Sequence, residues 1–136
     1  MIEKTFAIIK PDAVHDRVTG KIIDMIEQKG FDIIALKKIA MTKAEAQQLY
    51  AVHKGKHFCD ELVDYVISGP VIVMVLQKDN AIKAWRDLMG DTNPLKAADG
   101  TIRKLFGKSI GSNATHGSDA PETAAVEIAQ FFPELG

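Results

Sequence analysis

The stretch VIVMVLQ, residues 71–77, decides the fold, because it is apolar at every position but the last. Such a run is expected of a β-strand that is covered on at least one face and central in its sheet. Two further stretches indicate strands. Residues 4–10, KTFAIIK, predict a buried strand that ends before Pro11, since proline lacks the N–H that a sheet needs. Residues 31–41, FDIIALKKIAM, are β-branched and apolar enough for another.

Helical spacing and capping residues predict helices between these strands. Residues 19–30, TGKIIDMIEQKG, place isoleucines at helical spacing and end at a glycine, which is favourable after a helix C-terminus. Thr42 and Glu45 have the spacing of a capping box and open a helix that runs through Tyr50. A further helical stretch, residues 59–68, stops at a Gly-Pro pair.

Three more helices are predicted in the second half of the chain. Asn80 can cap the helix AIKAWRDLM, and Thr101 can cap the short helix IRKLF. Asp119, with Glu122 three residues later, is expected to cap the last helix. The buried stripe expected for that helix consists of Ala125, Ile128 and Phe132.

The predicted order is strand, helix, strand, helices, strand, helix, irregular stretch and helix, which favours an α/β or α+β fold. A short fourth strand around residues 115–118 would complete a ferredoxin-like split βαβ pattern. The pattern alone does not distinguish that fold from a small doubly wound sheet. Because no repeat, low-complexity tract or Pro/Gly/Ser-rich linker divides the chain, residues 1–136 are expected to form one domain.

The composition indicates a chain that needs no disulfide to fold and has no membrane-spanning segment. A chain of 136 residues can bury a sizeable core, and its single cysteine, Cys59, cannot form an intramolecular bridge. No apolar run approaches the ~20 residues of a membrane span, and the N-terminal residues lack the features of a signal peptide. We therefore expect a cytoplasmic location.

The charge balance excludes a global attraction to nucleic acid. Lys and Arg total 17 against 18 for Asp and Glu, which gives a formal net charge of −1. Any anion site must therefore be built locally. Lys10, Arg86 and Arg103 lie at the ends of predicted elements, with Thr92 nearby, and such groups could bind a phosphate chain. Taken singly, each charge is more often an ordinary solvated surface charge.

Common catalytic motifs are absent from the sequence. It contains neither GxxxxGK[ST] nor a GxGxxG after a strand, so neither a Walker loop nor a Rossmann fingerprint explains the cations. HExxH and GxSxG are also missing, which argues against a zinc protease and a serine hydrolase. His53 and His57 are four residues apart, but without a third ligand they are expected to be a surface pair.

The stretch NATHGSDA, residues 113–120, places His116 among small and polar neighbours. Gly117 and the residues after it predict a sharply bent backbone that presents an exposed imidazole. With metal spacing absent, His116 is a candidate for general acid/base or covalent catalysis. Glu127 on the following helix could orient its ring, as the third member of a catalytic triad does.

NATHGSDA resembles the N-x-x-H-G-S-D signature of the nucleoside diphosphate kinases. Four other stretches resemble blocks of that family in the same order, from about residue 4 to residue 132: TFAIIKPDAV, YAVHKGKHF, SGPVIVMVL and MGDTNPLKAADGTIRKLF. The resemblance implies an antiparallel ferredoxin-like βαββαβ sheet flanked by helices. It also implies a ping-pong kinase that moves the γ-phosphoryl group of a nucleoside triphosphate, typically ATP, to a nucleoside diphosphate through a phosphohistidine, with broad base and sugar specificity.

Residue roles follow from the same resemblance. His116 would be the nucleophile, Glu127 and Ser118 would hold its ring, and Lys10 and Tyr50 would lie beside the transferred phosphoryl group. Arg86, Thr92 and Arg103 would bind the other phosphates. Mg²⁺ would be carried by the nucleotide, with no metal ligand from the protein. Asn113 would bind the ribose, and the base would lie between Phe58 and Ile110.

The resemblance also implies an assembly and shows some departures. Members of the family are tetramers or hexamers of a common dimer, so a homo-oligomer is expected. His57 stands where proline is common, Thr115 where an aliphatic residue is usual, and Ser112 where the family often has a basic residue. None of these departures removes a group with an implied catalytic role.

Two alternatives remain from other functional classes. One is a catalytically silent nucleotide-binding module. The other is a ferredoxin-like interaction protein in which the histidine is only a hydrogen-bonded loop residue. Both predict the loss of at least one implied site residue, whereas the sequence retains Lys10, Tyr50, Arg86, Arg103, Asn113 and His116.

Overall fold

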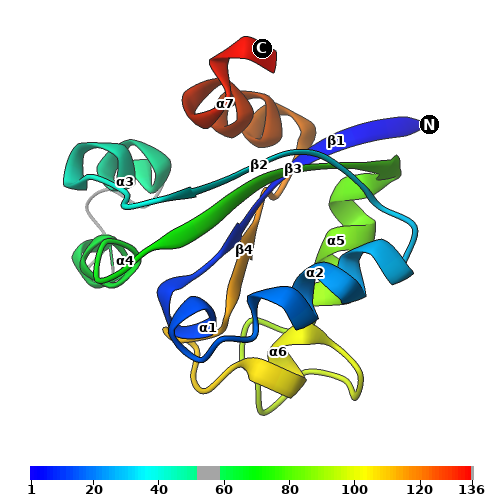
Figure 1. Cartoon of the computed structure of the whole chain (residues 1–136), viewed down its shortest axis with the longest axis horizontal. Helices are drawn as coiled ribbons and strands as arrows, with labels where there is room; N and C mark the ends of the chain where they lie inside the picture. Colours follow the sequence, from blue (N-terminus) through cyan, green and yellow to red (C-terminus); the bar gives the residue numbers. More distant parts are fainter. Residues whose placement is uncertain (52–58, 136) are drawn as a thin grey trace.

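The computed structural model describes residues 1–51 and 59–135, which form a four-stranded antiparallel sheet flanked by helices (Figure 1). The strands are β1 (Ile2–Ile9), β2 (Asp32–Ile39), β3 (Val71–Asp79) and β4 (Thr115–Gly117), in the spatial order β2-β3-β1-β4. This order and the intervening helices make the ferredoxin-like α+β fold, and the short fourth strand is confirmed. The doubly wound alternative is excluded because every strand pair is antiparallel.

The central strands β1 and β3 are apolar without interruption along residues 6–9 and 71–76, where both of their faces are covered. Their side chains alternate between two separate cores, as the two-residue period of a strand requires. Ala7 and Met74 belong to the core beneath α2 (Thr19–Gln28) and α5 (Ala81–Met89). Phe6 and Val73 belong to the opposite core, beneath α3 (Lys43–Leu49), α4 (Cys59–Val66) and α7 (Pro121–Phe131).

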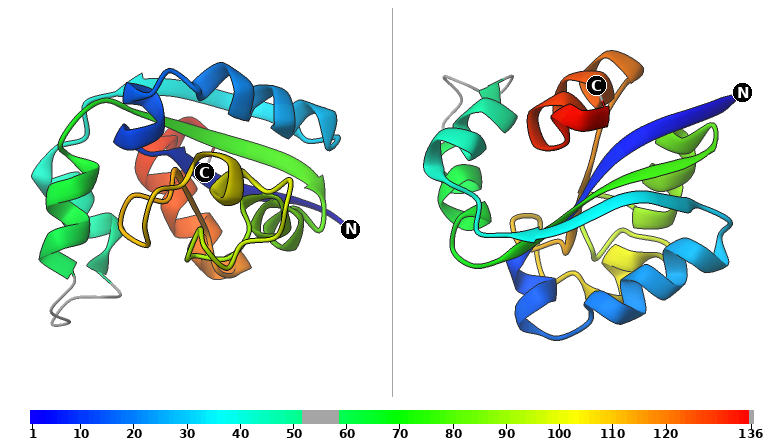
Figure 2. Two further views of the ribbon diagram at one scale, coloured as in Figure 1. Left: turned by 90° about the horizontal axis from the view of Figure 1, so that it is seen from below. Right: turned by 45° about the horizontal axis from the view of Figure 1, so that its top comes forward.

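The helices form two layers around the sheet (Figures 1 and 2). In Figure 1, α7 lies above the strands, while α2, α5 and the short α6 (Ile102–Phe106) lie below them. The five-residue α1 (Pro11–His15) follows β1 directly, and the 3₁₀ helix η2 (Pro133–Leu135) follows α7. No helix among residues 1–51 and 59–135 is long and apolar enough to cross a membrane.

Two predicted helix caps are present. Thr42 and Glu45 form both hydrogen bonds of a capping box at the start of α3. At the start of α6, the Thr101 hydroxyl accepts a hydrogen bond from the Lys104 N–H at 3.3 Å. Gly30, just beyond α2, has φ +84°, the left-handed conformation expected after a helix. These predictions depended only on neighbours in the sequence.

Two other predicted caps are wrong. Asn80 occupies the N-cap position of α5 with φ 52°, but its side chain makes no capping hydrogen bond within the described residues. The Ile82 N–H instead donates to Glu3 Oε1 at 2.9 Å, so a side chain from β1 satisfies this helix end. Asp119 does not cap α7, whose N-cap residue is Ala120, because its carboxylate pairs with Arg86.

The buried stripe of α7 is also shifted from the prediction. Ile128 and Phe132 are buried as expected, but Ala125 is exposed, and Ala124 is buried instead. The buried face includes Glu127, which the prediction of the stripe omitted because it considered only apolar residues. Glu127 is buried because Ser118 supplies it with a hydrogen bond at 2.7 Å.

Candidate active site

A cavity of about 340 Å³ lies beside β4, bordered by side chains from α5, α6 and the loops around them. Eight residues that the sequence analysis assigned to the site line it: Lys10, Tyr50, Arg86, Thr92, Arg103, Ile110, Asn113 and His116. Ser118 and Glu127 lie behind His116 rather than in the lining. Phe58 and His57 lie outside the described residues.

His116 lies on β4, opposite Ile8 of β1, and not in a bent loop as predicted. Its side chain is only 20 % exposed, so the predicted exposed imidazole is wrong as well. The rings of Phe6 and Tyr50 meet it edge-on, with centroids 6.5 and 6.0 Å away. The sheet and the neighbouring aromatic rings therefore hold the imidazole at the cavity wall.

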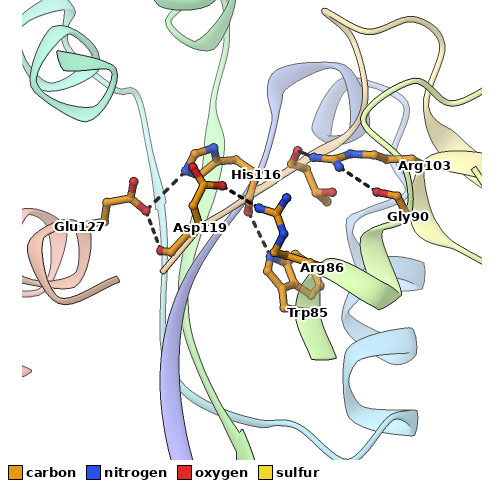
Figure 3. Close-up of polar contacts among 9 residues, drawn as sticks. Trp85, Arg86, Gly90, Arg103, His116, Asp119 and Glu127 are labelled. Carbon is orange, nitrogen blue, oxygen red and sulfur yellow. Dashed lines mark hydrogen bonds and ion pairs between the residues drawn. The ribbon is translucent and has the colours of Figure 1, made fainter. Parts of the chain in front are cut away.

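A buried carboxylate stands behind this histidine. Glu127 Oε1 lies 3.5 Å from His116 Nε2 and accepts a hydrogen bond from Ser118 Oγ at 2.7 Å (Figure 3). Glu127 is 5 % exposed and Ser118 is 1 % exposed, so water does not compete for these contacts. The carboxylate is thus fixed by the serine and directed at one nitrogen of the imidazole.

Gly117 has a packing role that the sequence analysis missed. A Cβ atom at this position would lie 2.5 Å from Trp85 Cδ1 and 2.7 Å from Met89 Cε. The glycine therefore allows α5 to approach β4, and it does not serve to bend the backbone. The positive φ in this region, 73°, belongs instead to Ala114.

Lys10 and Asn113 form a buried polar pair at one side of the cavity. Lys10 Nζ donates to Asn113 Oδ1 at 3.0 Å, and Asn113 Nδ2 donates to the Thr92 carbonyl at 3.1 Å. Burial, together with the charge of Arg103 and partly opposed by Asp12, lowers the pKa of Lys10 to about 8. The pair therefore holds a poorly solvated ammonium group beside the cavity.

Arg103 is a second buried cation and is anchored to the backbone. Its guanidinium donates to the Gly90 carbonyl at 3.0 Å and to the Thr115 carbonyl at 2.9 Å (Figure 3). Burial and the charge of Arg86 lower its pKa to about 10, so Arg103 carries its charge at neutral pH. A Cβ at Gly90, whose φ is +87°, would lie 2.6 Å from Thr101 Oγ1, so this turn requires glycine.

Arg86 lies at the entrance of the cavity, where it is half exposed. Its guanidinium pairs with the Asp119 carboxylate at 2.6 Å, and the two side chains are 50 % and 75 % exposed (Figure 3). Thr92 is exposed, and Ile110 is 60 % exposed. Arg86, Asp119, Thr92 and Ile110 can exchange their present contacts for contacts with a ligand at little cost in free energy, because all four are already exposed to water.

Tyr50 also lines the cavity, with its ring against that of His116. Its side chain is 4 % exposed, and burial, followed by the charge of Glu127, raises the pKa of its phenol well above the ordinary value. The tyrosine is therefore neutral at physiological pH and presents a hydroxyl group beside the histidine.

Among the departures noted in the sequence, Thr115 is fully buried on β4, and its carbonyl accepts a bond from Arg103. Ser112 is half-buried and its N–H donates to Ser109 Oγ at 3.1 Å. His15, which has no implied catalytic role, has a side chain that is 88 % exposed to solvent beside Asp16.

The geometry matches that of a known family. Residues 3–135 match the model of the family "Nucleoside diphosphate kinase". The chain is 60 % identical over 131 residues to a nucleoside diphosphate kinase of Rhodopseudomonas palustris (strain BisB5), which covers 96 % of this chain and 94 % of that protein.

Solved structures give the same match. The Aquifex aeolicus nucleoside diphosphate kinase superposes with a TM-score of 0.96 at 42 % identity, over 99 % of this chain and 98 % of that chain. A halophilic nucleoside diphosphate kinase from Halobacterium salinarum, solved in complex with CDP, superposes with a TM-score of 0.93 at 39 % identity, over 97 % of this chain and 88 % of that chain.

Proposed function

This chain belongs to the nucleoside diphosphate kinase family, whose members transfer a phosphoryl group between nucleotides, and on that premise we propose that His116 carries the group in transit. The observation that supports this role is the placement of the histidine. His116 lines the cavity that Lys10, Arg86 and Arg103 also line, and its Nε2 faces a buried carboxylate. A neutral imidazole is a competent nucleophile near pH 7.

The two nitrogens of the imidazole have different tasks in this proposal. Glu127, 3.5 Å from Nε2, favours the tautomer that carries the proton there, which leaves a lone pair on Nδ1. Nδ1 attacks the γ-phosphorus of a nucleoside triphosphate, and the bond from that phosphorus to the bridging oxygen breaks, releasing the diphosphate. The terminal oxygen of a second diphosphate then attacks the phosphorus, and the electrons of the N–P bond return to Nδ1.

Three cations would bind the phosphates and offset the charge that develops during transfer. Lys10 and Tyr50 would contact the transferred group, while Arg86, Thr92 and Arg103 would bind the remaining phosphates. Lys10 and Arg103 are already fixed by hydrogen bonds, so they need little reorganisation.

Mg²⁺ enters the proposal as part of the nucleotide. The charged groups lining the cavity are cations apart from Asp119, which suits a polyphosphate that brings its own metal rather than a resident ion. Within residues 1–51 and 59–135, no group of three or more His, Cys, Asp or Glu side chains could hold a metal. Bound to the phosphates, Mg²⁺ would neutralise part of their charge.

The nucleoside would extend from the buried Asn113 to the exposed Ile110. Asn113 would bind the ribose, and Ile110 would cover one face of the base with Phe58 on the other. Apolar contact and stacking are available to every base, since each has a flat π-face. We therefore propose that purine and pyrimidine nucleotides, with ribose or deoxyribose, are all substrates.

We also propose that the protein is a cytoplasmic homo-oligomer and that each chain forms a single domain. Strand β2 lies at the edge of the sheet and leaves Ile34 and Leu36 38 % and 44 % exposed, as expected of a surface that a second copy covers. We propose a tetramer or hexamer built from such dimers, with residues 1–136 forming one kinase domain.

Incubation with ATP labelled at the γ-phosphate tests the role of His116. We expect an acid-labile, alkali-stable label on the wild-type protein, and none on His116→Ala, which should also lose roughly 10⁴-fold or more in exchange activity. His15→Gln is the matched control, because this exposed histidine should leave labelling and exchange unchanged. An His116→Ala variant that still exchanges phosphate near the wild-type rate would contradict the proposal.

A panel of acceptors tests the breadth of specificity. We expect kcat/KM for ADP, GDP, CDP, UDP and their deoxy forms to differ by less than about 10³-fold, since stacking differences amount to a few kcal/mol. Discrimination of about 10⁴-fold or more generally needs a polar group that the wrong substrate leaves unpaired. One base favoured by that factor would mean that a side chain reads the base edge.

A further inference from the structure

Trp85 contacts the backbone of the residue that we propose as nucleophile. Its indole Nε1–H donates to the carbonyl of His116 at 3.2 Å (Figure 3). Trp85 is fully buried on α5, and its ring lies edge-on to Phe31 with centroids 6.3 Å apart. This contact is separate from the phosphate-binding groups, because Trp85 does not line the cavity.

The contact falls where β4 has the least support from the sheet. Strand β4 has three residues and lies at the sheet edge, and within residues 1–51 and 59–135 it pairs only with β1. On either side of His116, Lys10 N–H donates to the Ala114 carbonyl at 2.8 Å and Ser118 N–H donates to the Phe6 carbonyl at 3.3 Å. A strand this short has few hydrogen bonds with which to hold its position.

Two helices add side-chain hydrogen bonds to those that the sheet provides. Arg103 of α6 binds the Thr115 carbonyl at 2.9 Å, and Trp85 of α5 binds the carbonyl of the next residue, His116. Gly117 follows directly, and its lack of a Cβ allows the indole to approach. The indole therefore both packs on the strand and hydrogen-bonds to it at the histidine itself.

We propose that Trp85 is a positioning residue for phosphoryl transfer, which fixes the main chain of His116 while Glu127 fixes its ring. The inference rests on the proposed role of His116. Transfer requires the attacking nitrogen to lie close to and in line with the phosphorus, and a displacement of about 1 Å can cost about 10²-fold in rate. Anchors on the main chain and on the ring together limit such displacements.

The test separates positioning from stability through single-turnover kinetics. Trp85→Phe keeps an aromatic ring but removes the N–H donor. We expect the maximal rate of His116 phosphorylation at saturating ATP to fall about tenfold, while the dissociation constant for ADP changes less than about twofold. Incorporation of benzothienylalanine at position 85 is the second variant, because it replaces only the N–H with sulfur and preserves the shape.

Phe31→Leu is the matched control. Phe31 is buried against Trp85 but does not line the cavity, so this variant should melt at a lower temperature and keep its maximal phosphorylation rate. If Trp85→Phe and the benzothienylalanine protein both phosphorylate at the wild-type rate, the positioning role is overturned. If wild-type His116 takes no label at all, the proposed function fails first, and this result is distinct from the other.

Discussion

The two arginines of the cavity show how differently its inner and outer parts are built. Arg103 is 8 % exposed and donates to two backbone carbonyls, whereas Arg86 is half exposed and makes one ion pair with Asp119. We call Lys10, Arg103 and Asn113 the floor of the cavity, and Arg86, Asp119 and Ile110 its rim. The floor residues are at most 8 % exposed, and the rim side chains are at least half exposed.

The difference teaches which groups are ready before a nucleotide binds. Floor cations are held by hydrogen bonds, and their lowered pKa values record the free energy that burial of a charge costs. Rim charges neutralise each other in water, and in the proposed function Arg86 would exchange a carboxylate for a phosphate. Changes in the floor should therefore affect both folding and transfer, and changes in the rim should affect only binding.

The largest effect is expected from Arg103→Met. It leaves the Gly90 and Thr115 carbonyls without their guanidinium donor, so the free energy of unfolding should fall by about 2 kcal/mol. Loss of the buried positive charge should also lower kcat/KM by roughly 10²–10³-fold. Urea unfolding and steady-state kinetics measure the two effects. Arg103→Lys, which keeps a charge without the planar fork, should recover only part of either, and full recovery would show that charge alone suffices.

The pH dependence of stability and of nucleotide binding should reveal that burial disfavours the charged form of Lys10. Its pKa is about 8 in the folded protein against 10.5 for an ordinary lysine, so the unfolded chain binds more protons between these values. Stability should therefore rise with pH across that window. Nucleotide binding should weaken over the same window, because Lys10 loses the positive charge that we propose contacts phosphate.

Melting temperature and kcat/KM measured from pH 7 to pH 10 check these opposite slopes. We expect kcat/KM to fall by about tenfold for each pH unit well above 8, if only this group titrates. Lys10→Met should lack the contribution of this lysine to both slopes. A wild-type protein whose stability falls through this window would contradict the assignment.

The smallest effects are expected at the rim. Arg86→Ala should raise KM for nucleotides about fivefold, the value of one exposed ion pair, and leave the melting temperature unchanged. Asp119→Asn removes the partner of Arg86 and should change KM by less than about twofold, towards tighter binding. Loss of stability in either variant as large as that of Arg103→Met would erase the distinction between floor and rim.

The sequence predicted the strands well because both faces of β1 and β3 are buried along residues 6–9 and 71–76, which makes these stretches apolar without interruption. It also predicted the caps at Thr42 and Thr101, whose partners lie three residues away. The residue pattern alone already indicated the cations and His116 as candidates, and the resemblance to a family added the remaining site residues. Eight of the proposed residues line one cavity.

The failed predictions involve partners that are distant in the sequence. Glu3 replaces Asn80 as the cap of α5, because it accepts a hydrogen bond from the N–H of Ile82, 79 residues away. Asp119 binds Arg86, which is 33 residues away. Gly117 accommodates Trp85 of α5. None of these pairings leaves a periodic signal, so local patterns could not reveal them. Trp85 itself gave no signal beyond that of a large apolar residue on a helix.

The hydrogen bond from Trp85 to His116 also has an optical consequence. The chain contains one tryptophan, so its ultraviolet-excited emission comes chiefly from an indole bonded to the main chain of the proposed nucleophile. A phosphoryl group on that histidine adds negative charge to the residue whose carbonyl this fluorophore binds. Rapid mixing with unlabelled ATP can therefore follow the half-reaction in real time, without a coupled assay or a radioactive donor.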